Sequence, residues 1–392
     1  MDIDRFKNSP VGHLVPISGH DAYLQRDYTY SAFVPCPPPS MITLSQGTYN
    51  AVTKAALALG RLDFAVRRLP EPRLLVRPVL RREAQSTSEL EGTYAALDEV
   101  LAADFVDEAR RSAELREVMN YVVAAERAFE MIKTLPICRR VLCQLQKILV
   151  RETRGEMYDS GELRRRPVFI GERELGIEES RFVPVPSGPQ LEAGVSDWET
   201  WINSVEDDMP LVVKAAVGHY QFEALHPFSD GNGRLGRLIV VLQMIEAQVL
   251  TYPVLNLSPW LKRRKEQYKS LLLDISATGD YDPWVRFFST AVEAQAQDMV
   301  ERIEQLLTVR QQLLDLAREN RIRGFALQVI EDLIGYSSIT PSSMAKRHDV
   351  QYKTANDTFK RLEGLGILRE ITGASYGRIY VCPRVTEIVL RP

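Results

Sequence analysis

The sequence contains few of the residues that build disulfide frameworks or zinc sites. Its 392 residues include five histidines and four cysteines, Cys36, Cys138, Cys143 and Cys382. The cysteines form neither a CxxC pair nor a paired framework, and no HExxH pattern occurs, so the sequence argues against a structural or catalytic zinc site. Isolated thiols of this kind fit a reducing compartment best, and we expect a cytoplasmic protein.

Long hydrophobic runs and an excess of charge of one sign are also lacking. No stretch approaches the roughly 18 apolar residues of a membrane span, and the N-terminus, MDIDRFKNSPVGH, lacks the apolar region of a signal peptide. We therefore expect no membrane association. The formal net charge is −3, so no global field draws the chain to nucleic acid.

Apolar residues at helical spacing occupy most of the chain from Thr43 onward. Further segments with this spacing are 80–104, 106–130, 132–150, 190–205, 208–224, 258–276 and 282–318. Residues 1–42 are predicted to be loop-like, with the Pro-rich segment 34–40 as a surface arm. Around 161–186 a polar stretch lies between VFIG and RFVPVP, which predicts a short β-hairpin. The expected fold class is therefore mainly α.

The C-terminal part differs in kind from the rest of the chain. Three short helical patterns, in FALQVIEDLIG, SSMAKRHD and YKTANDTFKRLEGLG, precede a terminal hairpin, which suggests a winged helix-turn-helix. Residues 337–392 contain nine Lys and Arg against five Asp and Glu, and such an excess permits DNA binding. The candidate recognition helix would offer Tyr352, Lys353, Asn356 and Lys360. Winged helices also serve as protein-docking or dimerisation modules, and that alternative stays open.

Residues 225–237, LHPFSDGNGRLGR, combine an imidazole, a carboxylate and two guanidinium groups in a loop with little side-chain bulk. The apolar helix before the loop cannot continue through Pro227, which lacks an N–H donor. Gly231 and Gly233 allow backbone conformations that are closed to other residues. Because a new helix is expected to start near Gly233–Arg234, its free N–H groups would form an anion cradle beside the loop.

The charged side chains of this loop complete the pattern. Arg234 and Arg237 lie three residues apart near a helix N-terminus, where cations are unfavourable unless a polyanion lies between them. Asp230 beside a phosphate cradle is placed to hold a divalent ion, and His226 is a natural general base. Each element alone is usually structural, but their combination indicates a site that transfers part of a nucleoside triphosphate to a hydroxyl.

HPFSDGNGRLGR resembles the Fic motif, HxFx(D/E)GNGRxxR, at every fixed position. The resemblance implies a helical-bundle core that moves AMP from ATP to a Ser, Thr or Tyr hydroxyl of a protein. It implies that His226 deprotonates the hydroxyl, Phe228 anchors the loop and Asp230 binds Mg²⁺. It assigns the nucleotide, chiefly its phosphates, to the other motif positions: Ser229, Gly231, Asn232, Gly233, Arg234 and Arg237. The Doc branch typically has Lys at the position of Gly233, so glycine favours AMP transfer.

The stretch QSTSELEG at 85–92 has two interpretations. Ser88 and Glu91 have the spacing of a capping box at a helix start. The stretch also resembles the family's inhibitory motif, (S/T)xxxE(G/N), with Thr87 and Glu91 at its fixed positions on one helical face. That resemblance implies that Glu91 pairs with Arg237 in the place of the γ-phosphate, so that the enzyme inhibits itself.

The resemblance also implies a target-docking flap and a nucleoside pocket. Ile170 and Gly171 match the flap, which would bind the target segment as an added strand. Tyr268 matches one position of the nucleoside pocket, while Arg264 replaces the usual Asn, which leaves the base open. Gln221 is a further candidate for contact with the base, although a single glutamine on a helix face is more often solvated.

These features predict three parts: an N-terminal arm and helical region at 1–110 with the inhibitory helix at about 80–95, a Fic catalytic core at 111–320, and a winged helix-turn-helix at 321–392. The predicted function is protein adenylyltransferase, autoinhibited by Glu91 and with the protein itself among its targets, with ATP as substrate and Mg²⁺ as cofactor. The alternatives are a DNA-binding regulator with a nucleotide-sensing core, and an enzyme that removes AMP. A homodimer is plausible from the resemblance alone.

Overall fold

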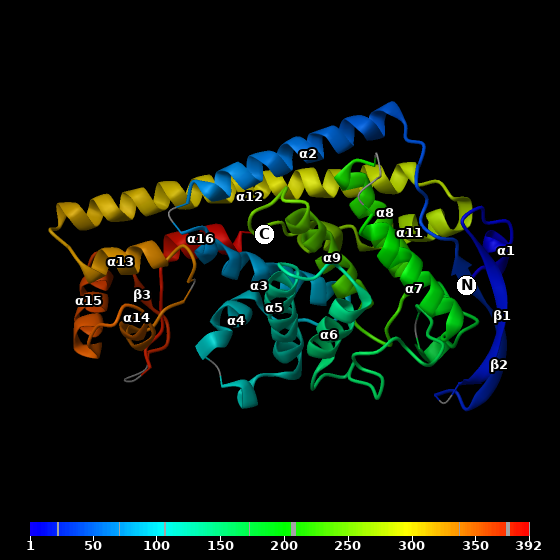
Figure 1. The fold of residues 1–392 in the computed structure, drawn as a ribbon. Coiled ribbons are helices and arrows are strands. Elements are labelled where there is room, and N and C mark those ends of the chain that lie inside the picture. The colour runs from blue at the N-terminus through cyan, green and yellow to red at the C-terminus, as the bar shows by residue number, and fades with distance from the viewer. Residues whose placement is uncertain are drawn as a thin grey trace.

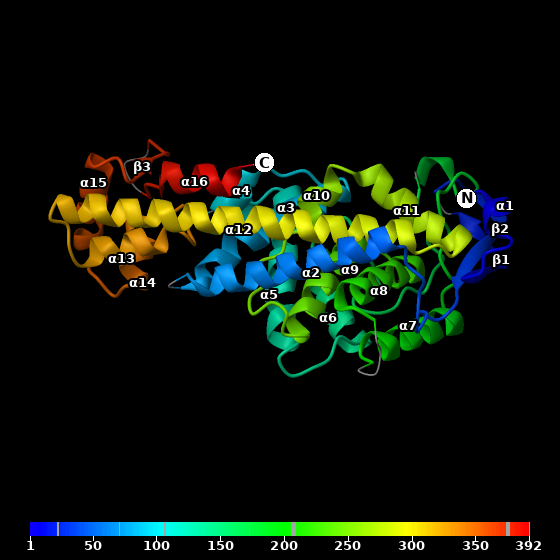
Figure 2. The same ribbon diagram turned by 90° about the horizontal axis from the view of Figure 1, so that it is seen from above.

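The computed structural model describes residues 1–21, 23–69, 71–105, 107–171, 173–204, 209–336, 338–373 and 377–391. It is mainly helical, as predicted, and is built along the 38-residue helix α12 (Asp282–Glu319), which runs about 57 Å at 1.5 Å per residue. Helix α2 (Gln46–Arg67) packs lengthwise against α12, and both views show the pair side by side (Figures 1 and 2). None of the helices in the described ranges combines the length and the apolar composition needed to span a bilayer.

The helices between these two cover the middle of the molecule. They are α3 (Pro72–Leu90), α4 (Leu97–Ala102), α5 (Ala113–Met131), α6 (Arg139–Val150), α7 (Pro189–Ile202), α8 (Leu211–Leu225), α9 (Asn232–Glu246), α10 (Ser258–Lys262) and α11 (Lys265–Thr278). Short 3₁₀ turns lie at Ala103–Phe105, Glu108–Arg110 and Arg173–Leu175. The sequence pattern located most of these helices, but the predicted helix ends at 106, 205 and 208 lie outside the described residues.

Helices α8 and α9 lie at the centre and position the candidate site. Helix α8 is buried along nearly its whole length and packs against α7, α9 and α12. Helix α3 packs against α5, α9 and α10, so its C-terminal end reaches the beginning of α9. The loop between α8 and α9 is therefore bordered by helices that are distant in sequence.

The N-terminal region differs from the prediction. After the short helix α1 (Ile3–Phe6), residues 12–35 form an antiparallel hairpin of β1 (Gly12–Asp21) and β2 (Arg26–Pro35) rather than a loop. Phe33 of this hairpin packs between Phe6 and Phe182, with ring centroids 5.7 and 5.8 Å away. Its backbone N–H also donates to the Val183 carbonyl at 2.9 Å. The hairpin is therefore held by contacts with residues about 150 positions later.

The hairpin predicted around 161–186 is present in a reduced form. Ile170 and Phe182 form a single antiparallel bridge, with the Ile170 N–H donating to the Phe182 carbonyl at 2.8 Å. A Cβ at Gly171 would lie 2.9 Å from Ser180 Cα, so this close approach of the two sides requires glycine.

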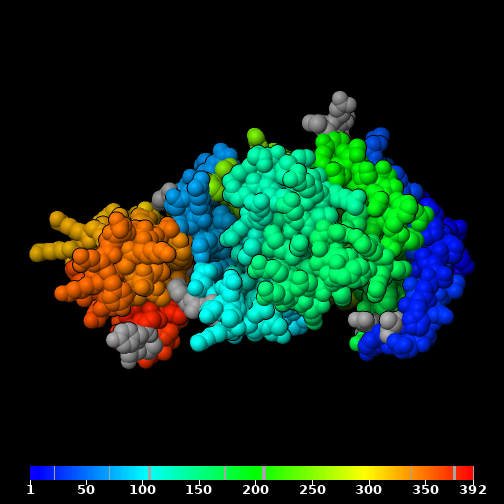
Figure 3. All heavy atoms as spheres, turned by 60° about the horizontal axis from the view of Figure 1, so that its bottom comes forward, coloured from blue at the N-terminus to red at the C-terminus, as the bar shows by residue number. Residues whose placement is uncertain are grey.

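The C-terminal elements form one end of the molecule, opposite the N-terminal hairpin (Figure 3). They are α13 (Phe325–Asp332), α14 (Pro341–Arg347), α15 (Tyr352–Gly364), the paired two-residue strands β3 (Arg369–Glu370) and β4 (Tyr380–Val381), and α16 (Pro383–Leu390). Helix α16 was not predicted; it packs on α12, where buried Arg302 donates to the Ile388 carbonyl at 2.5 Å. The winged helix-turn-helix assignment and the three-part division stay predictions.

Candidate active site

The loop between α8 and α9 is fixed by its backbone. Helix α8 ends at His226, whose φ of 48° and ψ of 60° place it in the left-handed region. This conformation costs a non-glycine residue about 1–2 kcal/mol and turns the chain sharply before Pro227. Gly231 has φ 87° and caps α9, which begins at Asn232, slightly earlier than predicted. The first N–H groups of α9 therefore face the loop.

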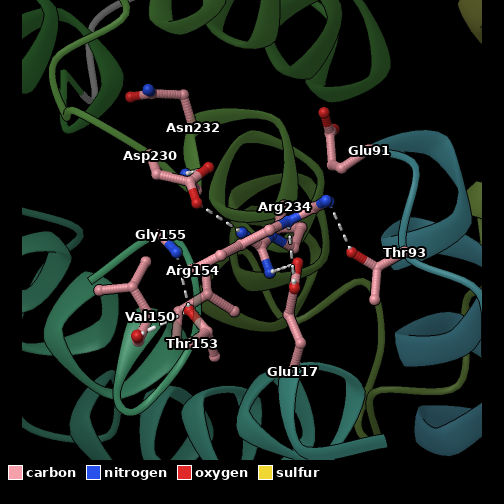
Figure 4. A network of polar contacts seen from close by, with 12 residues as sticks. Glu91, Thr93, Glu117, Val150, Thr153, Arg154, Gly155, Asp230, Asn232 and Arg234 are labelled. Atoms are coloured by element: carbon pink, nitrogen blue, oxygen red, sulfur yellow. Dashed lines mark hydrogen bonds and ion pairs between the residues drawn. The ribbon is translucent and has the colours of Figure 1, made fainter. Parts of the chain in front are cut away.

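Asn232 closes the loop on itself. Its Oδ1 accepts from the Phe228 N–H at 2.9 Å, and its Nδ2 donates to the Phe228 carbonyl at 2.7 Å. The Phe228 side chain is buried in the core, as expected for an anchor. The Asn232 amide is thus used within the loop, and Figure 4 shows it directed away from the neighbouring charged cluster. The backbone N–H of Asn232 is left for a phosphate.

Arg164 holds the outer side of the same loop and was not singled out from the sequence. Its backbone N–H donates to the Pro227 carbonyl at 2.9 Å, and its Nε donates to the His226 carbonyl at 2.8 Å. Its Nη2 donates to the carbonyls of Val185 and Leu225. The side chain is buried, and burial lowers the pKa of Arg164 to about 10.

Arg164→Met is expected to lower the free energy of unfolding by about 2–5 kcal/mol, because several buried carbonyls lose their donor at about 1–3 kcal/mol each. Chemical denaturation followed by circular dichroism measures this change. The matched control is Arg165→Met, since the Arg165 side chain pairs with Glu162 at the exposed surface, a contact worth under about 1 kcal/mol. Equal effects of the two substitutions would contradict the role given to Arg164.

His226 faces a cavity of about 150 Å³. Its Nδ1 lies 3.4 Å from the Glu223 carbonyl, which favours the tautomer with the proton on Nδ1 and leaves Nε2 with a free lone pair. Burial, reinforced by the charge of Arg164, lowers the pKa of His226 to about 4. The imidazole is therefore neutral at pH 7 and able to accept a proton.

Arg237 reaches the same cavity from α9 and contacts the end of α3. Its Nε donates to Thr87 Oγ1 at 2.7 Å, and its Nη2 donates to Glu91 Oε1 at 2.5 Å. Burial is the largest influence on the pKa of Arg237 and lowers it, but Glu91, Tyr268 and Glu223 together outweigh burial and raise the pKa. In Glu91, burial raises the pKa, but Arg237 more than compensates and lowers it. The two side chains form an ion pair across the cavity.

The end of α3 fixes the position of Glu91. Glu91 is the C-terminal cap residue, followed by Gly92 with φ 89°. The Gly92 N–H donates to the Glu89 carbonyl at 3.1 Å and the Thr93 N–H to the Ser88 carbonyl at 2.9 Å, which is a Schellman motif. The capping-box interpretation is therefore wrong, because Ser88 lies in the last turn of the helix.

Gly233 permits the approach of Glu91 to α9. A Cβ at Gly233 would overlap Glu91 Oε1 and would lie 3.0 Å from Arg237 Nη1. The glycine is therefore needed for the carboxylate to reach the N-terminus of α9. A carboxylate is favoured at this position by the helix dipole, as a phosphate would be.

Arg234 belongs to a separate charged cluster, shown in Figure 4. Its guanidinium is buried and donates from Nη1 to Glu117 Oε1 on α5 at 2.7 Å. Its Nη2 lies 3.4 Å from Asp230 Oδ2, and Arg154 Nε lies 3.8 Å from Glu117 Oε2. Arg234, which the motif assigns to the phosphates, is thus paired with the carboxylates of Glu117 and Asp230.

Asp230 is half-exposed at the N-terminus of α9. Its Oδ1 accepts from the Gly231 N–H at 2.6 Å, and its Oδ2 lies against the backbone of Gly155, where a Cβ would overlap it. Among the described residues no three His, Cys, Asp or Glu side chains converge on one point. A divalent ion held by Asp230 alone would take its other ligands from water and phosphate oxygens.

The structure brings only part of the predicted site to the cavity. Its lining includes six of the predicted residues: Glu91, Ile170, His226, Gly233, Arg237 and Tyr268. Ser229 instead donates to Asp159 Oδ2 at 2.9 Å, beneath the loop. Tyr268 is buried, and its hydroxyl lies 2.7 Å from His219 Nε2.

Gln221 and Arg264 are corrections to the predicted base pocket, since neither is among the described residues that line the cavity. Gln221 is buried and donates from Nε2 to the Cys36 carbonyl at 2.8 Å, which attaches the Pro-rich segment to α8. Arg264 is exposed, with its guanidinium 4.0 Å from the Trp260 ring centroid. The residues that line the cavity also include Glu223, Lys269 and Arg181.

Comparison with known families agrees with this geometry. Residues 49–130 match the model described as Fic/DOC family N-terminal, and residues 136–244 match the model described as Fic/DOC family. The chain contains a Fic domain. The central helices and the loop 225–237 lie within or against these two matched segments.

The Fic-domain chain is similar to proteins named protein adenylyltransferase Fic. It is 31% identical over 216 residues to the protein from Aedes aegypti and 29% identical over 216 residues to that from Culex quinquefasciatus. Each match covers 53% of this chain and 38% of the relative, so the chain spans well under half the length of these relatives. A Fic family protein from Desulfovibrio desulfuricans G20 shares the fold, with a TM-score of 0.57, 19% identity, and 88% of this chain and 98% of that chain covered.

Proposed function

We propose that this protein is an adenylyltransferase that moves AMP from ATP to a Ser, Thr or Tyr hydroxyl of a target protein, itself included. The observation that carries the proposal is the meeting of His226, Arg237 and Gly233 in one cavity at the N-terminus of α9. A neutral base, a cation and free backbone N–H groups are the groups that such a transfer requires. The adenylyltransferase names of the relatives support the same reaction.

In the proposed reaction His226 Nε2 removes the proton of the target hydroxyl as its oxygen attacks the α-phosphorus of ATP. A bond forms between that oxygen and the phosphorus, the bond from the α-phosphorus to the bridging oxygen breaks, and pyrophosphate leaves. The hydrogen bond from Nδ1 to the Glu223 carbonyl orients the imidazole for this step.

The phosphates would bind where α9 begins. The backbone N–H groups around Gly233 and the helix dipole favour negative charge there, and Arg237 supplies the cation once its carboxylate partner leaves. Asp230 would hold Mg²⁺, which when bound neutralises phosphate charge. The cluster of Arg234 with Glu117 holds the α9 end of this cradle rigid.

Glu91 inhibits the enzyme in this proposal. Its carboxylate lies 2.5 Å from Arg237 Nη2, in the position where a terminal phosphate would pair with the same guanidinium. Breaking a partly buried ion pair is costly, so ATP binds productively only when the end of α3 moves. Thr87 holds the other side of Arg237 and keeps it aimed at Glu91.

Several further roles belong to the same proposal. Residues Ile170 and Gly171 would bind the target segment along the bridge to Phe182, by strand addition. DNA binding through α15, where Tyr352 is exposed, a homodimer and a cytoplasmic location stay predictions. Removal of AMP, with Glu91 positioning a water, is the alternative direction of the same chemistry.

Incubation of Glu91→Gly with ATP, GTP, CTP and UTP, each labelled at the α-phosphate, tests the proposal. Mass spectrometry of the products is expected to find one adenylyl group on a hydroxyl side chain, and much less transfer from the other nucleotides. Absence of a nucleotidyl adduct on this protein and on added bacterial or insect-cell proteins would contradict it.

A further inference from the structure

Tyr220 and Glu223 of α8 and its C-cap residue His226 line the cavity at three-residue spacing, together with Ala224. Residues three apart lie on one helical face, and at 1.5 Å per residue Glu223 lies about 4.5 Å and Tyr220 about 9 Å along the axis from His226. The helix therefore presents three different groups along the length of the cavity, starting at the proposed point of attack on the α-phosphorus.

The carboxyl group of Glu223 is the middle group, and one of its oxygens lacks a hydrogen-bond partner among the described residues. Its Oε1 is buried without a hydrogen bond, and the side chain is 13% exposed. His219 Nε2 lies 4.0 Å from this oxygen and is within 2.7 Å of the Tyr268 hydroxyl instead. Burial raises the pKa of Glu223 to about 7, although Arg237 opposes the shift. A buried carboxyl without a partner is unfavourable, so a ligand group that satisfies it would bind there.

The space for Glu223 is made by a glycine on the facing helix. A Cβ at Gly236 would lie 2.5 Å from Glu223 Oε1. Helix α9 thus comes close to α8 at this point, and the carboxyl has room beside it only because residue 236 has no side chain. The carboxyl group is confined between α8 and α9 at the wall of the cavity.

The two ends of the cavity differ in chemistry. The end near Arg237 and Gly233 suits phosphates, because a cation and the N-terminus of α9 lie there. Around Tyr220 the lining is apolar, with Leu272 and Leu273, and the Tyr220 hydroxyl already bonds Ser276 Oγ at 3.0 Å. A nucleotide that places its α-phosphate beside His226 and its base among these apolar residues has its sugar at Glu223.

We propose that Glu223 accepts hydrogen bonds from the ribose hydroxyls, and that this contact makes the site select ribonucleotides over deoxyribonucleotides. The inference rests on the proposed function. In its ionised form the Glu223 carboxyl group only accepts, and both ribose hydroxyls can donate to it. Acidic side chains bind ribose hydroxyls in the same way in dinucleotide-binding folds.

The test is calorimetric binding of ATP, 2′-deoxy-ATP and 3′-deoxy-ATP to Glu91→Gly and to Glu91→Gly/Glu223→Ala. Hydrogen bonds to a charged group correspond to about 10- to 150-fold in affinity. We expect Glu91→Gly to prefer ATP by at least about 10-fold over one deoxy analogue, and the double variant to bind all three within about threefold. Glu223→Gln, which keeps the volume and one acceptor oxygen, is expected to give an intermediate ratio.

The matched control is Glu91→Gly/Glu130→Ala, because Glu130 is an exposed glutamate of α5 that pairs with Lys133 and is not among the described residues that line the cavity. It should leave the preference for ATP unchanged. If Glu91→Gly binds ATP and both deoxy analogues equally, or if the preference survives Glu223→Ala, this inference is overturned while the proposed function stands. Failure of Glu91→Gly to bind any triphosphate would overturn both.

Discussion

Replacement of Glu91 by glycine is expected to raise ATP-dependent labelling by about 10- to 100-fold. In the wild-type protein the Glu91 carboxylate occupies Arg237 at 2.5 Å and is held in place by the Schellman motif at the end of α3. A coupling of about 1–3 kcal/mol between this contact and nucleotide binding corresponds to about 5- to 150-fold. Initial rates of label incorporation at saturating ATP measure the change.

The neighbouring Glu89 offers a matched control for this prediction. Glu89 lies on the same helix end but pairs with Lys262, so Glu89→Gln removes a charge without freeing Arg237. Glu91→Gln is expected to activate the protein and Glu89→Gln to leave the rate within about twofold, as for other partly exposed pairs. Equal rates for wild type and Glu91→Gly would show that Glu91 does not inhibit.

Replacement of His226 by alanine in the Glu91→Gly background is expected to lower the labelling rate by about 10²- to 10⁴-fold, the usual contribution of a general base. The effect should fall on kcat, because the imidazole contributes to proton transfer rather than to phosphate binding. ATP affinity measured by calorimetry should change by less than about threefold, since Arg237 and the N-terminus of α9 remain.

Two further measurements make this prediction specific. His20→Ala, which changes an exposed histidine of the N-terminal hairpin, should leave the rate unchanged. A His226→Ala variant that binds ATP but retains most of its labelling would show that another group takes the proton. A variant that no longer binds ATP would show instead that His226 supports the loop.

The loop 225–237 could be predicted because its function depends on local backbone geometry. Pro227 prevents α8 from continuing, Gly231 with φ 87° caps α9, and His226 directly precedes the proline, so these features come from residues close together in sequence. Two short motifs, one at the end of α3 and one at the start of α9, implied the contact of Glu91 with Arg237. The direction of each side chain in the loop depends on the residues around it, and the motif does not specify those residues.

Most of the errors involve contacts between distant segments. Arg234 pairs with Glu117 on α5 and Gln221 with the Cys36 carbonyl, and neither partner is marked by a pattern. The N-terminal hairpin was missed because glycines, histidines and Pro16 interrupt its alternation. Its strands are held by packing against Phe182. Arg164 is one of three consecutive arginines, and only burial distinguishes it from Arg165 and Arg166.

The central claim is that the Fic loop positions ATP for transfer of its α-phosphoryl group and that Glu91 prevents this. The most direct measurement incubates wild type, Glu91→Gly and Glu91→Gly/His226→Ala with ATP radiolabelled either at the α- or at the γ-phosphate. The account predicts protein-bound label only from α-labelled ATP, strongly in Glu91→Gly and at background in the double variant. Label transferred from the γ-phosphate, or equal labelling in all three proteins, would contradict it.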